Sequence, residues 1–252
     1  MLSIIIPQYN KPEMTENTID SVLENTSGDF EIVLVDNGST EQISNKYKKL
    51  VKYVRVDKNA FFAGGCNIGS NYSSGNILCF MNNDIILTRG WDSSAVMLDN
   101  REDVGIVGIK LLYPNKTIQH AGIRFFTTND WRGNCPDHVY RNFPDSYPAA
   151  NLAQELQAVT GALFFIRKSD FEAVDGFETS YINNYEDIDL CFKVRFNLNK
   201  KIIYWPQAEV YHLETQTPRT NENTAFAENH KIFMQRWSDK IKIDGSIEML
   251  RG

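Results

Sequence analysis

Cysteine is sparse in this sequence, and its spacing argues against two kinds of site. The four cysteines lie far apart and include no Cys-x-x-Cys pair; they are Cys66, Cys79, Cys135 and Cys191. Zinc sites and disulfide frameworks usually need thiols at closer and more regular spacing. We therefore expect four reduced thiols, as in a cytoplasmic protein.

Long apolar runs and a basic excess are also missing. No apolar run approaches the ~20 residues that a membrane-spanning helix needs. The chain passes from Met1 directly into a strand-like segment, without a basic stretch or a cleavage site, so we expect no secretory signal. A formal net charge of -6 argues against a general nucleic-acid-binding protein, which usually carries a basic excess. These absences favour a cytoplasmic protein without a nucleic-acid partner, and they leave peripheral attachment to the inner face of a membrane open.

The residues that are present suit a globular domain with an α/β fold. With 252 residues and 42% hydrophobic content, the chain is long and apolar enough to bury a core as one domain. Strand-like runs at residues 4–6, 31–35, 53–56 and 77–81 alternate with helix-like segments. Helical segments of this length between strands imply right-handed crossovers. We therefore predict a mostly parallel central sheet flanked by helices.

The second half is less regular. Residues 113–156 carry many aromatic residues, prolines and asparagines with little periodicity, and long irregular segments in compact domains are often functional loops. Helical patterns return at residues 186–198 and 223–237. In the last helix, Phe226, Phe233 and Trp237 follow one another at steps of 7 and 4 residues, close to one helical face. We expect this face to pack on the domain or on a partner.

The sharpest change of character falls within residues 77–84. Five apolar residues are typical of a strand buried on both faces, and Asn82, Asn83 and Asp84 follow them directly. Open α/β sheets bind ligands at the carboxyl ends of their strands. A carboxylate there can hold Mg²⁺ or Mn²⁺, which prefer oxygen ligands. Since all three polar residues also favour turns, a plain turn is the alternative.

Three further strand ends present polar groups, at Asn10, Asp36 and His212. Because the strands of one parallel sheet share a carboxyl edge, these side chains can converge with Asp84. Asp36 could hydrogen-bond a base or a ribose, or it could belong to a strand-to-helix turn capped by Ser39. His212 could bind a ligand, although a lone histidine is more often a packed or capped residue.

A glycine-rich segment at residues 59–69 follows the third strand. Its small residues would let the backbone approach a ligand closely. The segment is not a Gly-x-Gly-x-x-Gly dinucleotide fingerprint, and Lys58 precedes the glycines instead of following them. A P-loop is therefore absent.

Glu186, Asp187 and Asp189 begin a helical pattern. In the structural explanation, acidic residues in a first turn interact favourably with the helix dipole. In the functional explanation, one carboxylate faces a cleft and takes a proton from a sugar hydroxyl as that oxygen attacks. Spacing alone does not decide between them.

Taken together, these segments resemble the family-2 glycosyltransferases, which have the GT-A fold. The matching segments, in order, are residues 6–10, 35–39, 59–69, 82–84, 160–167, 176–177 and 185–190, and His212. Each segment is short, but eight in the family's order span nearly the whole chain. The glycine-rich segment and residues 119–122, which include His120, are similar to rhamnosyltransferase-like members that use dTDP-sugars.

The resemblance implies a role for each matching residue. The nucleotide-sugar donor would be bound by Pro7, Tyr9, Asn10, Asp36, Asn59, Asn67, Asn82 and Asn83. Asp84 matches the retained carboxylate of the family's Asp-x-Asp metal motif, in which Asn82 replaces the first Asp. His212 matches a late histidine that completes the metal site, and the implied cofactor is Mn²⁺ or Mg²⁺. Asp187 would be the catalytic base, and Glu186 would orient the acceptor.

By this resemblance the protein would be an inverting hexosyltransferase. It would move a sugar from a dTDP- or UDP-sugar to a hydroxyl group of a glycan or lipid-linked glycan, as in bacterial surface polysaccharide synthesis. A non-catalytic nucleotide-sugar-binding module is an alternative, since Asn82 removes one carboxylate. A sugar-nucleotide pyrophosphorylase would need a glycine-rich loop with basic residues after the first strand, and residues 7–12 do not supply one.

The resemblance also suggests how the chain is divided. We expect a transferase domain at residues 1–218, with a nucleotide-sugar-binding half at 1–109 and an acceptor-binding, catalytic half at 110–218. Residues 219–252 would form a helical extension.

Overall fold

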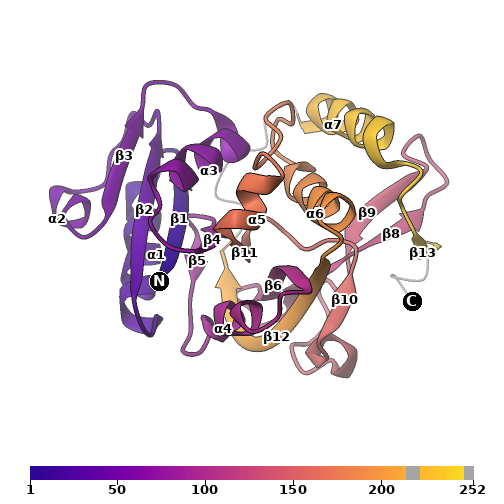
Figure 1. Ribbon diagram of the computed structural model, residues 1–252, viewed down its shortest axis with the longest axis horizontal. Helices are drawn as coiled ribbons and strands as arrows, with labels where there is room; N and C mark the ends of the chain where they lie inside the picture. The colour runs from indigo at the N-terminus through magenta and orange to yellow at the C-terminus, as the bar shows by residue number, and fades with distance from the viewer. Residues whose placement is uncertain (214–221, 247–252) are drawn as a thin grey trace.

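The computed structural model describes residues 1–213 and 222–246 (Figure 1). The first half of the chain contains β1 (Leu2–Gln8), α1 (Pro12–Asn25), β2 (Phe30–Asn37), α2 (Asn45–Lys48), β3 (Lys52–Val56), α3 (Phe61–Tyr72), β4 (Ile77–Met81), β5 (Ile85–Ile86), α4 (Ser93–Asp99) and β6 (Val104–Leu112). The second half contains β7 (Ile118–His120), β8 (Ile123–Thr127), β9 (Asn134–His138), the 3-10 helix η1 (Pro148–Asn151), β10 (Gln154–Leu156), β11 (Leu163–Arg167), α5 (Lys168–Ala173), α6 (Glu186–Asn197), β12 (Lys201–His212), α7 (Glu222–Trp237) and β13 (Ile243–Ser246).

A central sheet with the order β10-β12-β6-β11-β4-β1-β2-β3 confirms the α/β class. Strands β3, β2, β1 and β4 are parallel, as predicted for the first half. The sheet as a whole is mixed, because β11 lies antiparallel between β4 and β6. Between β6 and β11 the chain contains no α-helix. A crossover helix is the usual connection between parallel neighbours, so its absence accounts for the departure from the parallel order.

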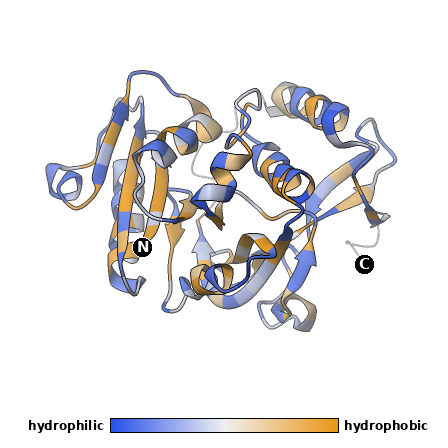
Figure 2. Cartoon of the chain, in the orientation of Figure 1, coloured by the Kyte–Doolittle hydropathy of each residue, from blue (hydrophilic) through white to orange (hydrophobic). Residues whose placement is uncertain are grey.

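The sheet has an apolar cluster on each face, because successive strand side chains point to opposite sides. Ile5 of β1 belongs to the cluster covered by α3, α5 and α6, whereas Ile4 and Ile6 belong to the cluster covered by α1 and α4. Figure 2 shows hydrophobic residues concentrated on the central strands between these helices. The strands therefore read as continuous apolar runs, and polar residues begin where the strands end.

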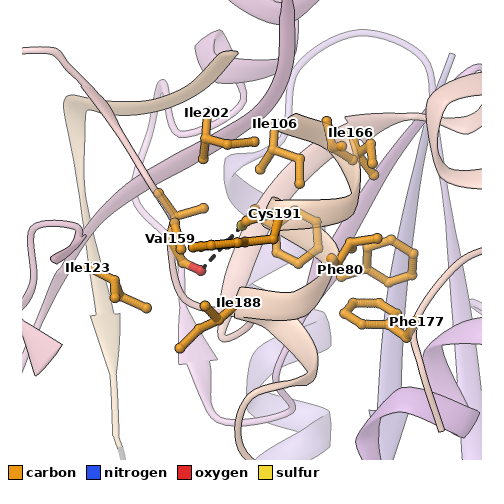
Figure 3. Packing of buried hydrophobic residues seen from close by; sticks show 14 of the residues in the cluster. Phe80, Ile106, Ile123, Val159, Ile166, Phe177, Ile188, Cys191 and Ile202 are labelled. Carbon is orange, nitrogen blue, oxygen red and sulfur yellow. Dashed lines mark hydrogen bonds between the residues drawn. The ribbon is translucent and has the colours of Figure 1, made fainter. Parts of the chain in front are cut away.

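Helix α6 is fixed on the sheet by its buried side chains (Figure 3). Ile188 and Cys191 lie in one cluster with Val159, Ile106 and Ile202. The Cys191 thiol also contacts the Val159 carbonyl oxygen, with Sγ and O 3.8 Å apart. All four cysteines are buried free thiols, as the sequence predicts.

The glycine-rich segment forms most of helix α3, and its glycines allow the helix to pack closely on β1. A Cβ at Gly69 would lie 2.3 Å from Ile5 Cγ2, and one at Gly65 would lie 3.0 Å from Pro7 Cβ. Helix α3 can therefore lie directly against β1 because glycines occupy the positions of contact.

Residues 113–156 are more regular than the sequence suggests. They include β7, β8, β9 and β10, and β8 pairs with β9 and β13 in a small second sheet. Tyr140, Phe143 and Tyr147 contact one another, with ring centroids 4.8–6.1 Å apart. These aromatic residues are partly buried and pack against the main apolar cluster. Short strands without clear alternation do not reveal such packing in a sequence.

Helix α7 packs on the domain, which confirms the prediction for its apolar face. Phe233 is fully buried, and Phe226, Ile232 and Trp237 pack against the same cluster. The expected boundary between residues 109 and 110 falls inside β6, and the expected boundary after residue 218 lies outside the described residues. No helix in residues 1–213 or 222–246 is long and apolar enough to cross a membrane.

Candidate active site

Two loops are tied together at the carboxyl edge of β1 and β2. Asn10 has a left-handed backbone, with φ 57°, and its side-chain oxygen accepts hydrogen bonds from the N–H groups of Thr40 and Glu41 at 2.8 and 3.2 Å. The Asn10 N–H donates to the Ser39 hydroxyl at 2.8 Å. Half-buried Pro7 is the last residue but one of β1 and lies in register with Val35 of β2. Asn10 therefore helps to build the wall of the predicted donor site.

Asp36 is fully buried at the end of β2. Its carboxylate accepts hydrogen bonds from the Tyr53 hydroxyl, from Arg55 at 2.5 Å and from the Ser39 N–H at 2.9 Å. Burial by itself raises the pKa of Asp36, but these hydrogen bonds outweigh burial and lower that pKa. The carboxylate is therefore charged at neutral pH, and the partly exposed Arg55 connects it to solvent.

Asn37, which follows Asp36 in the segment predicted to contact a base or a ribose, also shapes this edge. Its side chain accepts a hydrogen bond from the Ala60 N–H at 2.9 Å and donates to the Phe61 carbonyl at 2.8 Å. Asn59 lies beside this contact, is exposed, and accepts a hydrogen bond from the Phe61 N–H at 2.8 Å. Asn37 thus fixes the loop that presents Asn59, and Tyr9, also exposed, follows β1. The position of Asn37 next to Asp36 in one sequence motif could have indicated this role.

Two predicted donor residues contact other parts of the protein. Both amide atoms of Asn67 are hydrogen-bonded to the Phe177 backbone at 2.9 Å, which joins α3 to the loop after α5. The Asn83 side chain donates to the Thr15 hydroxyl at 2.9 Å, and its carbonyl accepts a hydrogen bond from Thr18 at 2.9 Å. In this structure both side chains hold elements together, and the donor-binding roles that the resemblance implies for them stay predictions. Such long-range contacts leave no local pattern in a sequence.

Asp84 and His212 meet although they are far apart in the sequence. Asp84 Oδ1 and His212 Nε2 are 3.0 Å apart, and both side chains are largely buried. Asn82 lies beside them, with its amide nitrogen 3.2 Å from His212 Nε2. The pairing of β5 with the end of β12 brings these residues together. The predicted metal residues and Asn82 therefore form one cluster.

The chemistry of this cluster fits a divalent cation. His212 Nδ1 lies 2.8 Å from the Gln119 side-chain oxygen, so this nitrogen carries the proton and Nε2 presents a lone pair. Apart from its 3.0 Å contact with His212 Nε2, the buried Asp84 Oδ1 has no polar partner among the described residues. In this tautomer the Nε2 lone pair and the carboxylate oxygen face each other, and a divalent cation bound between them would stabilise the arrangement. Within residues 1–213 and 222–246 no third His, Cys, Asp or Glu joins the pair, which suits a metal that takes its other ligands from phosphate and water.

The acidic pair at the start of α6 is held asymmetrically. Asp187 Oδ2 accepts a hydrogen bond from the Gly161 N–H at 2.6 Å, and Oδ1 accepts one from the Ile188 N–H at 2.8 Å. Glu186 is buried, and its Oε2 has no hydrogen-bond partner in the described part of the chain. The backbone donors therefore orient Asp187 and favour its charged form.

The two carboxyl groups differ in pKa for the same reason. Burial, together with the neighbouring charge of Asp187, raises the pKa of Glu186 to about 8. Burial also raises the pKa of Asp187, but the N–H groups of Gly161 and Ile188 oppose this effect. The N–H groups of Gly161 and Ile188 therefore favour the ionised form of Asp187, whereas burial and the Asp187 charge favour the protonated form of Glu186.

Residues 160–162 join the acidic pair to the Asp84 side of the site. The Gly161 N–H binds Asp187, and the Ala162 carbonyl accepts a hydrogen bond from the Asn82 N–H at 2.9 Å. The Thr160 N–H lies 3.4 Å from Nε2 of the buried His120. A Cβ on Gly161 would lie 3.0 Å from Asp187 Cβ and 3.2 Å from Phe62, so only glycine fits there without adjustment. The segment thus sets the spacing between the two acidic sites.

Comparison of the sequence with known proteins identifies a family. Residues 3–175 match the model of Glycosyl transferase family 2. The uncharacterized protein y4gI of Sinorhizobium fredii is 33% identical over 239 residues, which cover 89% of this chain and 25% of that protein. The O-antigen biosynthesis protein RfbC of Myxococcus xanthus is 26% identical over 233 residues, which cover 87% of this chain and 18% of RfbC. The chain thus spans a quarter or less of the length of these two relatives.

Solved structures share the fold at low sequence identity. GalNAc-T7, solved with UDP, GalNAc and Mn²⁺, has a TM-score of 0.74 at 17% identity, covering 95% of this chain and 49% of that one. The mannosyltransferase PcManGT of Pyrobaculum calidifontis, solved with GDP-Man and Mn²⁺, has a TM-score of 0.66 at 16% identity, covering 94% of this chain and 64% of that one. These two likenesses establish the fold.

Proposed function

This chain belongs to glycosyl transferase family 2, and from that premise we propose that it transfers a hexosyl group, with inversion, from a UDP- or dTDP-sugar to a hydroxyl group of a glycan or lipid-linked glycan. The observation that carries the proposal is the joining of the Asp84–His212 pair and Asp187 by the short segment 160–162. One side suits a leaving diphosphate, and the other suits an incoming hydroxyl group. The Mn²⁺ and nucleotide ligands of the two solved structures support this arrangement.

The nucleoside would lie against the loops that follow β1, β2 and β3. Exposed Tyr9 and Asn59 are available for contact, and Asn10 and Asn37 hold their loops in place. Asp36 is fully buried and would act through the partly exposed Arg55, with which it already pairs. The carboxyl edge of a parallel sheet is the usual position for such a ligand.

Asp84 and His212 would hold Mn²⁺ or Mg²⁺, which when bound supplies a Lewis acid for the diphosphate. Gln119 keeps the proton of His212 on Nδ1 and so directs the Nε2 lone pair toward Asp84. Asn82 lies close enough to contact the donor or His212, and it replaces a carboxylate without adding charge. The protein thus supplies one negative charge at this point, which limits repulsion of an anionic donor.

Asp187 would act as the base. As the acceptor oxygen forms a bond to the anomeric carbon, the bond from that carbon to the diphosphate oxygen breaks, and the hydroxyl proton passes to Asp187. The Gly161 and Ile188 N–H groups keep the carboxylate oriented and charged before the reaction. Glu186, protonated near neutral pH, would orient the acceptor through its unpartnered Oε2.

The acceptor is proposed from the relatives and from the exposed aromatic surface. RfbC is named for O-antigen biosynthesis, which supports a role in surface polysaccharide synthesis. Trp131, 64% exposed between β8 and β9, contacts Phe226 of α7. Aromatic faces of this kind suit sugar rings.

Donor hydrolysis tests the proposal without knowledge of the acceptor. Release of nucleoside diphosphate would be measured with UDP-glucose, UDP-N-acetylglucosamine and dTDP-L-rhamnose, with Mn²⁺ and then with EDTA. We expect turnover of at least one donor with Mn²⁺, none with EDTA, and a rate roughly 10²–10⁴-fold lower in Asp187→Asn. Donor binding without any turnover, even with a panel of glycan acceptors, would support a non-catalytic binding module instead.

A further inference from the structure

The chain has an unusual backbone just before the acidic pair. Three consecutive residues that are not glycine are left-handed: Asn183 has φ 46°, Asn184 has φ 82° and Tyr185 has φ 75°. Asparagine tolerates this region better than most residues, whereas a bulky residue such as Tyr185 does not. Glu186 and Asp187 follow directly as the first residues of α6. The direction in which the pair points therefore depends on what stabilises this turn.

Asn229 of α7 stabilises the turn from the outside. It is 2% exposed, and its side-chain oxygen accepts a hydrogen bond from the Ile182 N–H at 3.2 Å. Its amide nitrogen lies 3.1, 3.0 and 3.0 Å from the carbonyl oxygens of Ile182, Asn183 and Asn184. One side chain thus contacts four backbone groups that the left-handed turn leaves without helical or sheet partners.

The next residue of α7 holds the end of the same turn. His230 Nε2 lies 2.8 Å from the Arg132 carbonyl oxygen, which can only accept, so this nitrogen carries the proton. His230 Nδ1 therefore accepts a hydrogen bond from the Tyr185 hydroxyl, at 2.8 Å. The Tyr185 ring is buried against Phe226 and Phe233. Tyr185 is thus fixed at both its ring and its hydroxyl group.

Helix α7 is itself held in place by contacts away from this turn. The Trp237 indole N–H donates to Asp189 Oδ1 of α6 at 2.7 Å, and Arg236 forms an ion pair with the same oxygen at 3.2 Å. Phe233 stacks on Phe125 of β8. The helix therefore spans α6, the turn before it and the second sheet, and it can act as a fixed support.

We infer that Asn229 is a positioning residue for the transfer reaction, which holds the 183–185 turn so that Asp187 faces the acceptor hydroxyl. The inference rests on the proposed function of Asp187. Asn229 contacts no residue assigned to the donor, so its loss would act on the chemical step and not on donor binding. It lies beyond the region that matches the family model, which ends at residue 175.

The test compares single-turnover hydrolysis and donor affinity in a double-mutant cycle. The probe is whichever of the three donors the wild-type protein hydrolyses fastest, with Mn²⁺. We expect Asn229→Ala to lower the hydrolysis rate by roughly 10- to 100-fold at unchanged donor Kd. In an Asp187→Asn background, Asn229→Ala should have little further effect, because the two residues act through one carboxylate.

A matched variant separates positioning from simple destabilisation. Met234→Ala removes a partly buried side chain of the same helix that cannot hydrogen-bond the turn, and it should keep the wild-type rate. If Asn229→Ala does not fold, Asn229→Asp is measured instead, since it keeps the acceptor for Ile182 but lacks the N–H groups. Equal rates for wild type and Asn229 variants, with Asp187→Asn strongly slowed, would overturn this inference alone. A near-wild-type rate in Asp187→Asn would overturn the proposed function.

Discussion

Glu186 and Asp187 are chemically similar neighbours with different surroundings. Two backbone N–H groups contact Asp187, whereas Glu186 is buried with an unpartnered oxygen. A base must be ionised before it reacts, and a group that orients a hydroxyl can be neutral. The hydrogen bonds therefore divide the two roles at the level of single residues.

Replacing Asp187 by asparagine tests the base directly. The amide keeps the shape of the side chain but cannot take up the proton, so transfer should fall by roughly 10²–10⁴ while donor affinity stays nearly unchanged. Single-turnover transfer and calorimetric donor titration measure the two quantities. Glu186→Gln is the control and should lose less. If Glu186→Gln lost more than Asp187→Asn, the base would be Glu186.

The raised pKa of Glu186 predicts a pH-dependent stability. The folded protein retains this proton up to a pKa of about 8, whereas the unfolded chain releases it near the ordinary value of 4.5. The folded state thus binds more protons within this window, so stability from this group is complete below the window and is lost as pH rises through it. Glu186→Gln cannot titrate. The wild-type free energy of unfolding relative to Glu186→Gln should fall by about 1.4 kcal/mol per pH unit within the window. Urea denaturation of both proteins, at pH values from about 5 to about 9, measures this difference in the free energy of unfolding. A difference that does not change with pH would contradict a buried neutral Glu186.

At the scale of elements, the separation between α3 and β1 is set by missing side chains. Gly65 and Gly69 lie where a Cβ would meet Pro7 or Ile5. The N-terminal end of the same helix is held by Asn37, next to the loops that are proposed to contact the nucleoside. A displaced helix would therefore disturb the predicted nucleoside site as well as the core.

Gly69→Ala should destabilise the fold although alanine favours helices. The helical preference contributes ~1 kcal/mol. The added Cβ, 2.3 Å from Ile5 Cγ2, would force the core apart at a cost of about 1–3 kcal/mol, so the net effect should be a loss of ~1 kcal/mol. Urea denaturation measures this loss, with Asn71→Ala on the exposed side of α3 as the control. A gain in stability would show that α3 moves freely on β1.

At the scale of the whole molecule, the site combines predictable and unpredictable parts. The strand ends at Asp36 and Asp84 could be found because each apolar run and the polar residues after it are adjacent in the sequence. The Gly161–Asp187 contact spans 26 positions, and the Asn229–Ile182 contact spans 47. Such contacts depend on the position of β11 and on the docking of α7, which no local pattern specifies. The sequence therefore predicts candidate reactive groups but not the contacts that position them.

Binding of a metal and a nucleotide should stabilise the whole chain. At 100 times Kd, a ligand that binds only the folded state contributes about 2.7 kcal/mol, which corresponds to roughly 5–10 °C in Tm for a protein of this size. We expect this shift with UDP or dTDP plus Mn²⁺, and its loss with EDTA or in Asp84→Ala. Thermal unfolding of wild type, Asp84→Ala and a control at exposed Asp57 measures it. An equal Tm shift in EDTA would show that nucleotide binding does not need the metal.

The position of β11 has a consequence for synthesis of the chain. Strand β11 lies between β4 and β6, yet the ribosome makes both of those strands before it. Until residues 163–167 emerge, the facing edges of β4 and β6 carry unpaired backbone groups, which attract other chains. Nascent chains begin to fold from the N-terminus, so these edges are exposed while translation continues. A fragment that ends before Leu163 should therefore aggregate or occupy a chaperone instead of folding into a nucleotide-binding unit.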